Sequence, residues 1–165
     1  MKNTFSILRI AISLLVVLMI LLLNQFMYLL PIHIGSFIIT ITAVIIADVQ
    51  ALLWARGKLP MLQSRPLIFL HSVVSVGLLT SITSGVLLFW PLREYLVTVE
   101  AFWVKVVFVG VLIINAFIIG RHMHIPTTRT FSSLSKKARR PLFLSGAASG
   151  VSWIVVFASA LLLNV

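Results

Sequence analysis

The chain contains no cysteine and very few acidic residues. Of its 165 residues, three are Asp or Glu and 13 are Lys or Arg. The absence of Cys excludes disulfides, thiolate metal sites and cysteine catalysis. The three acids, Asp48, Glu94 and Glu100, form no cluster that would hold Mg²⁺ or Ca²⁺. No glycine-rich phosphate loop is present either, so the sequence predicts no metal site and no nucleotide site.

Charge of either sign is scarce, and apolar residues are in excess. Hydrophobic residues make up 61% of the chain and charged residues 10%, whereas a soluble domain has about 25% charged residues. So much apolar surface must face lipid. A spanning helix needs roughly 20 apolar residues. The sequence therefore predicts an all-α integral membrane bundle that forms one domain, residues 1–165.

The apolar residues fall into five runs. The predicted transmembrane helices cover residues 10–30, 32–54, 66–90, 101–120 and 141–163. The first run is too long for a signal peptide and ends without a cleavage site. Pro31, Pro66 and Pro141 each stand where a new helix would begin, since proline needs no backbone N–H there. We therefore expect a tight hairpin at Pro31, and we expect Pro91 to stop the third helix.

The basic residues lie in the gaps between the runs, and they predict the orientation. Those on one side are Lys2, Arg9, Arg56, Lys58, Arg65, Arg121, Arg129, Lys136, Lys137, Arg139 and Arg140. The positive-inside rule places this side in the cytoplasm, with the N-terminus inside and the C-terminus outside. The small size and this pattern favour a bacterial inner membrane. We expect the loops to contact anionic headgroups rather than nucleic acid.

Ionisable groups inside the bilayer are costly and usually face the bundle interior. Here they are His33, Asp48, His71 and Lys105. A rise of 1.5 Å per residue puts His33 and Lys105 in the outer leaflet, and Asp48 and His71 roughly 8 Å below the inner boundary. The sequence therefore predicts two polar layers, with Asp48 and His71 as a proton relay.

Plainer interpretations stay open for each group. Lys105 would snorkel to the outer surface along its stem, and His33 would be wetted by headgroups. Asp48 and His71 would form a structural hydrogen bond or ion pair. The segment Ser145–Gly150 spaces small residues by four, which is typical of helix packing within the chain or in a homo-oligomer.

Histidines in a helical bundle suggest haem. The predicted depths of His33 and His71 differ by roughly 15–20 Å, so the two cannot ligate one iron from opposite faces. A haem held by one histidine remains open.

Two short motifs are similar to known families. Ile32-His33-Ile34 and Phe102-Trp103-Val104-Lys105-Val106-Val107 resemble the HemJ-type protoporphyrinogen oxidases. Phe69-Leu70-His71 through Ser84-Gly85-Val86 resembles the group around copper-resistance protein D. The resemblance covers the second to fourth predicted helices. It implies a haem or porphyrin ligand, with His33 and Lys105 as catalytic residues and His33 and His71 as cofactor ligands.

Three hypotheses for function follow. The first is a haem- or porphyrin-associated membrane oxidoreductase that uses His33 and Lys105, His71 and Asp48, or both pairs. The second is a small proton-coupled transporter in which Asp48 and His71 carry the proton. The third is a non-catalytic subunit that binds a membrane partner through its small-residue faces.

Overall fold

The computed structural model describes residues 2–163, with side chains described from residue 27 onward. The described chain is helical throughout and has no strand. Its elements are α1 (Lys2–Ala55), α2 (Ser64–Leu96), α3 (Glu100–His122), α4 (His124–Thr128), the short 3₁₀ helix η1 (Phe131–Ser133) and α5 (Lys136–Leu162).

Four segments of the described chain are long and apolar enough to cross a membrane. They are Met27–Ala55, Ser64–Leu96, Glu100–Thr128 and Lys136–Leu162. These confirm the expectation of an all-α, multi-pass membrane protein. The further predicted span, residues 10–30, falls on the part of α1 whose side chains lie outside the described residues, so it stays a prediction.

The hairpin expected at Pro31 is wrong, because α1 runs through this proline. Pro91 likewise does not stop α2, which continues to Leu96, and Pro141 lies inside α5 instead of opening it. A proline within a helix removes one hydrogen bond, and membrane helices tolerate this where neighbouring groups or water satisfy the freed carbonyl. In α5 the helix start is set by Ser135, whose hydroxyl accepts a hydrogen bond from the Ala138 N–H at 3.3 Å.

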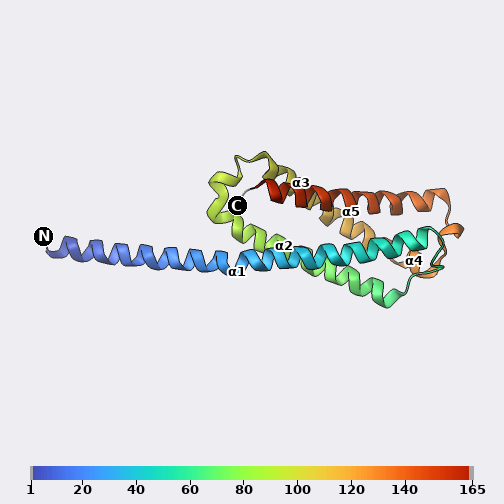
Figure 1. Cartoon of the computed structure of the whole chain (residues 1–165), viewed down its shortest axis with the longest axis horizontal. Coiled ribbons are helices and arrows are strands. Elements are labelled where there is room, and N and C mark those ends of the chain that lie inside the picture. Colours follow the sequence, from blue (N-terminus) through green and yellow to red (C-terminus); the bar gives the residue numbers. More distant parts are fainter. Residues whose placement is uncertain (1, 164–165) are drawn as a thin grey trace.

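The helices associate as two antiparallel pairs (Figure 1). α1 packs along α2 and α3 packs along α5, whereas the backbones of α2 and α3 approach each other at few points. Each pair is closely packed for a local reason. A Cβ atom on Gly77 of α2 would collide with the Thr40 hydroxyl of α1, and Asn115 of α3 hydrogen-bonds to Ser145 of α5. Small residues and polar contacts are the usual means of close helix approach in membranes.

Larger side chains fill the space between the two pairs. Phe37 of α1 packs against Trp153 and Phe157 of α5, with ring centroids 5.6 and 6.0 Å apart. Around them lies an apolar cluster, called the central cluster here, whose buried members are Val44, Leu78, Leu112, Trp153 and Val156. It occupies the middle of the bundle and draws on all four long helices.

The two ends of the bundle differ. At the basic end, the loop of residues 56–63 meets the connection of residues 123–135. Here the Trp54 indole N–H donates to the Arg129 carbonyl at 3.0 Å, and the Leu62 N–H donates to the Pro126 carbonyl at 2.8 Å. At the short-loop end, the Tyr95 hydroxyl donates to the Leu163 carbonyl at 3.3 Å. The two basic loops thus share one end, as the charge pattern predicts, whereas the N-terminal end of the unbroken α1 lies away from it (Figure 1).

Candidate functional site

The polar groups inside the bundle lie in two layers, one on each side of the central cluster. We call the first the His33 layer; it comprises His33, Ser36, Ser81, Ser84 and Lys105. We call the second the His71 layer; it comprises Asp48, His71, Asn115, Ser145 and Ser149. Ser84 follows His71 on α2 by thirteen residues, which corresponds to about 20 Å along the helix. Each layer therefore has its own surroundings.

In the His33 layer, α1 and α2 satisfy each other's polar groups. His33 Nδ1 lies 3.0 Å from Ser84 Oγ, and Ser36 Oγ lies 2.7 Å from Ser81 Oγ. The ring edge of His33 rests on Gly85, where an added Cβ would lie 3.2 Å from Cε1. The absence of a side chain at Gly85 therefore lets the imidazole lie flat against α2.

Ser84 joins the His33 ring to the backbone of α2. Its hydroxyl lies 3.0 Å from His33 Nδ1 and donates to the Thr80 carbonyl at 2.7 Å. The sequence offered no sign of this, because Ser84 is distant in the chain and one of many serines.

Lys105 belongs to this layer by register. Phe89 of α2 and Phe102 of α3 stack with centroids 5.3 Å apart. Gly85 lies one turn inward from Phe89, and Lys105 lies one turn inward from Phe102 on the same face of its helix. Lys105 is thus level with Gly85 and His33 along the bundle.

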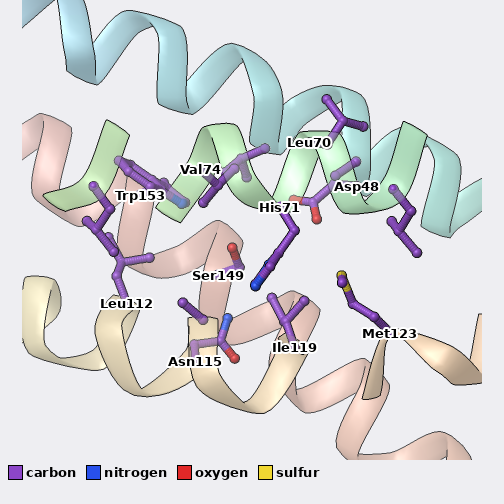
Figure 2. Close-up of a pocket in the computed structure, with 15 residues that line it drawn as sticks. Asp48, Leu70, His71, Val74, Leu112, Asn115, Ile119, Met123, Ser149 and Trp153 are labelled. Carbon is purple, nitrogen blue, oxygen red and sulfur yellow. The ribbon is translucent and has the colours of Figure 1, made fainter. Parts of the chain in front are cut away.

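The His71 layer contains a cavity of about 70 Å³ that is lined by α1, α2, α3 and α5. Figure 2 shows the ring of His71 pointing toward Ser149 and Asn115 between the two helix pairs. Asp48 and His71 are the two ionisable residues in the lining. The cavity extends from Leu67 and Met123, near the basic end, to the central cluster, which closes it toward the short-loop end.

His71 reaches across from one helix pair to the other. Its Nε2 would lie 3.3 Å from a Cβ on Gly120 of α3. Only a glycine leaves room for the ring at this distance without displacing it. The two deep histidines thus share an arrangement, each facing a glycine of another helix. The sequence did not predict that Gly85 contacts His33 or that Gly120 contacts His71.

Asp48 lies at the edge of the bundle, where its side chain lines the cavity and is also exposed. Neighbouring lipid-facing residues include Ile45 and Val49, which are 57% and 51% exposed. Among the described residues, no hydrogen bond or ion pair joins Asp48 to His71. The ion pair that the described residues do form joins Arg93 to Glu94, at 3.9 Å, near the short-loop end of the bundle. The relay pair predicted from the sequence therefore lines one cavity without a hydrogen bond or ion pair between the two side chains.

Asn115 and Ser145 anchor the far wall of the cavity. The Asn115 amide N–H donates to the Ser145 carbonyl at 3.0 Å, and the Ser145 hydroxyl donates to Asn115 Oδ1 at 2.6 Å. Both residues are buried. An amide has a second N–H and a second lone pair, so Asn115 retains hydrogen-bonding capacity toward the cavity.

The spaces in the described chain can be compared with the size of a porphyrin. Pockets for drug-sized ligands measure about 300–1,000 Å³, so the cavity beside His71 is too small. A larger open groove of about 590 Å³ lies between α1 and α2 on the lipid side, but residues such as Gly35, Val76 and Gly77 line it and no histidine does. Neither hollow therefore brings a histidine to a space of porphyrin size.

Metal-binding geometry gives a similar result. Within the part of the chain that the structure describes, no three His, Asp or Glu side chains gather closely enough to hold a metal ion. The side chains of Asp48, His71 and Asn115 in the cavity wall can bind protons or form hydrogen bonds.

The chain matches no family model, no curated protein and no solved structure.

Proposed function

We propose that this chain is a small proton-coupled membrane carrier, in which Asp48 and His71 take up and transfer protons on one side of the central cluster. The observation that carries the proposal is the cavity of about 70 Å³ shared by these two residues. Ionisable groups at membrane depth are expensive and are kept where they bind or move ions. Here two of them line one cavity at the boundary between two helix pairs.

The cavity is large enough to connect the two groups through water. A volume of about 70 Å³ corresponds to roughly two water molecules. Asp48, His71, Asn115 and Ser149 supply hydrogen-bond partners to such waters. The relay would run from Asp48, at the exposed edge, through water to His71, in the interior. The central cluster would prevent the proton from crossing freely, as a coupled carrier requires.

The position of His71 supports coupling between proton binding and helix movement. Its ring bridges α2 and α3, which belong to different helix pairs. A protonated imidazole demands more hydration than a neutral one, so protonation would favour separation of the pairs and entry of water or substrate. Carriers commonly alternate by motion of one bundle against another around a fixed site.

The topology and location are part of this proposal. We place the basic end in the cytoplasm, because Lys and Arg dominate its loops, and the short-loop end and C-terminus outside. This puts the cavity in the cytoplasmic half of a bacterial inner membrane. Because α1 continues through Pro31 without a break, we assign no side of the membrane to the N-terminus.

The test is proton flux into liposomes that contain the purified protein and a trapped pH-sensitive dye. We expect flux in the wild type, and a loss of at least about tenfold in Asp48→Asn, which removes the charge but keeps the shape. His71→Asn should lose flux similarly. Flux that is the same in both variants as in the wild type would contradict the carrier and favour a non-catalytic subunit.

Matched controls exist for both changes. Glu94→Gln removes an acid from the exposed short-loop end, where its side chain is 92% exposed. His33→Asn removes a deep histidine from the other polar layer. Neither should change the flux by more than about twofold, since neither residue lines the cavity.

Haem or porphyrin association is the other hypothesis, and one observation favours it. Ser84 contacts His33 through Nδ1 at 3.0 Å, which leaves Nε2 as the ring nitrogen for an iron ligand, and Lys105 is level with the ring. The two hollows described above do not fit a porphyrin, so the carrier is the better supported function. A visible spectrum with a Soret band that disappears in His33→Ala would reverse this ranking.

A further inference from the structure

The cavity between the helix pairs has one carboxylate in its wall. Asp48 of α1 supplies it, and the described residues that line the cavity include no lysine or arginine. Arg65 of α2 and Arg121 of α3 are exposed at the basic end and lie outside the lining. A charge held at membrane depth is stabilised when it pairs with an opposite charge. An ionised Asp48 therefore favours a ligand with one positive charge.

The other polar groups of the lining can accept hydrogen bonds. Figure 2 shows the ring of His71 pointing toward Ser149 and Asn115. A neutral imidazole has one acceptor nitrogen, and a hydroxyl oxygen has lone pairs as well. Asn115 Oδ1 accepts one bond from Ser145, which leaves its second lone pair. Together with the carboxylate, these acceptors suit a cation that carries several N–H groups.

The size of the cavity and the rest of its wall narrow the class of cation. A volume of about 70 Å³ holds roughly two water molecules, and so a ligand of about two non-hydrogen atoms. Most of the remaining wall is apolar, as at Val74 and Leu112. Such a wall can contact a methyl group, whereas hard metal cations need a shell of oxygen ligands. The cavity therefore fits a small ammonium ion better than a metal ion.

We propose, on the basis of the carrier function above, that this cavity binds a small ammonium ion, such as ammonium or methylammonium, in exchange for the proton of Asp48. The N–H groups of the ion donate to the carboxylate and to the acceptors of His71, Asn115 and Ser149. When the ion binds to the protonated form, the O–H bond of Asp48 breaks, the carboxylate keeps the electron pair, and the proton passes to water. One positive charge thus replaces another.

Competition with protons gives the binding a definite pH dependence. Among the lining residues, Asp48 of α1 and His71 of α2 titrate, whereas α3 and α5 contribute neutral side chains such as Asn115 and Ser149. A proton on either titrating group removes an acceptor and adds a positive charge. Affinity for the ammonium ion should therefore fall as the pH falls, by up to about tenfold per pH unit for each linked proton.

The test is calorimetry of the full chain in a neutral detergent, with methylammonium chloride as the probe. We expect saturable binding by the wild type, with proton release that a pH-sensitive dye detects in weak buffer. Sodium, which has no N–H group, and tetramethylammonium, which also is larger, should bind at least about tenfold more weakly, since they form no charge-assisted hydrogen bonds. These comparisons use the wild type alone, so they do not depend on whether a variant folds.

Asp48→Asn keeps the shape of the side chain and should weaken methylammonium binding by about tenfold or more, because the charge is lost. The matched control is Glu94→Gln, which removes an acid whose side chain is 92% exposed and should bind as the wild type does. No methylammonium bound by the wild type, equal affinity for tetramethylammonium, or equal binding by Asp48→Asn would overturn the site.

The carrier and its substrate fail in different ways. Proton flux that depends on Asp48, without binding of methylammonium, would keep the carrier and reject this substrate. Methylammonium binding that depends on Asp48, without proton flux in liposomes, would keep the site and reject the carrier.

Discussion

The His33 layer and the His71 layer contain similar residues but differ in how these are satisfied. In the His33 layer, serines of the closely packed α1–α2 pair bind the histidine and each other. In the His71 layer, groups from both helix pairs surround a cavity, and no hydrogen bond or ion pair joins Asp48 to His71. Polar groups that satisfy each other hold helices together, whereas groups with unused capacity and space can exchange protons. The comparison indicates that the His71 layer is the one whose polar groups have unused hydrogen-bonding capacity and space.

The largest expected effect concerns the packing that supports the His33 layer. In Gly77→Ala the new methyl group would collide with Thr40, which is 0% exposed and has no room to move. We expect a loss of about 1–3 kcal/mol in the free energy of unfolding, as for overpacking in other cores. Unfolding in mixed micelles measures it.

Gly110→Ala is the control for that change, because a Cβ there meets no atom within 4 Å. It should be neutral or stabilise the helix by up to about 1 kcal/mol, the difference in helix propensity. Equal stability of the two variants would show that Thr40 leaves room for a methyl group at position 77, which would contradict the close α1–α2 contact.

The next effect concerns the wall of the His71 layer. Asn115→Ala removes two buried hydrogen bonds and leaves the Ser145 hydroxyl without its acceptor. We expect a loss of about 1–2 kcal/mol, within the range for an unsatisfied buried partner. Thr42→Val, which affects an exposed hydroxyl bonded to its own helix, should change stability far less. A neutral Asn115→Ala would mean that water replaces the lost bonds.

A pair of glycine variants separates the two layers directly. Gly120→Ala should displace the ring of His71 and reduce proton flux severalfold. Gly85→Ala should displace the ring of His33 and leave the flux unchanged. The contacts involved are similar, at 3.3 and 3.2 Å. If both variants affected the same activity, the two layers would not be independent.

The smallest effect is expected at the basic end. Trp54→Phe keeps the ring that packs edge-on against Phe131 but loses the hydrogen bond to the Arg129 carbonyl. The expected loss is about 0.5–1.5 kcal/mol, the net value of one hydrogen bond. Thermal unfolding in detergent measures this loss. A loss above about 3 kcal/mol would exceed what one hydrogen bond contributes and would contradict this explanation.

The sequence predicts that His33 and His71 lie in separate layers, because the rise per residue along a helix is fixed. The structure places them on opposite sides of the central cluster. Helix ends were less predictable. Pro91 and Pro141 looked like boundaries, yet α2 and α5 include them, since the cap at Ser135 and the membrane setting outweigh one lost hydrogen bond.

The partners within each layer could not be read from the sequence. Hydropathy does not say that α1 pairs with α2 and α3 with α5, so it could not place Ser84 beside His33 or Gly120 beside His71. A signal was present in retrospect, since glycine in a membrane helix often marks close approach. Without the pairing of the helices, however, neither glycine could be assigned a partner.

The most direct test of the central claim is the sidedness of the cavity. Because the chain has no cysteine, Ala116→Cys places a single thiol in the cavity wall, and Val109→Cys places one beside the central cluster. In oriented vesicles, a membrane-impermeant maleimide should label position 116 from the cytoplasmic face alone and position 109 from neither face. Labelling of position 116 from the outer face, or from neither face, would contradict a water-accessible site that opens toward the basic end.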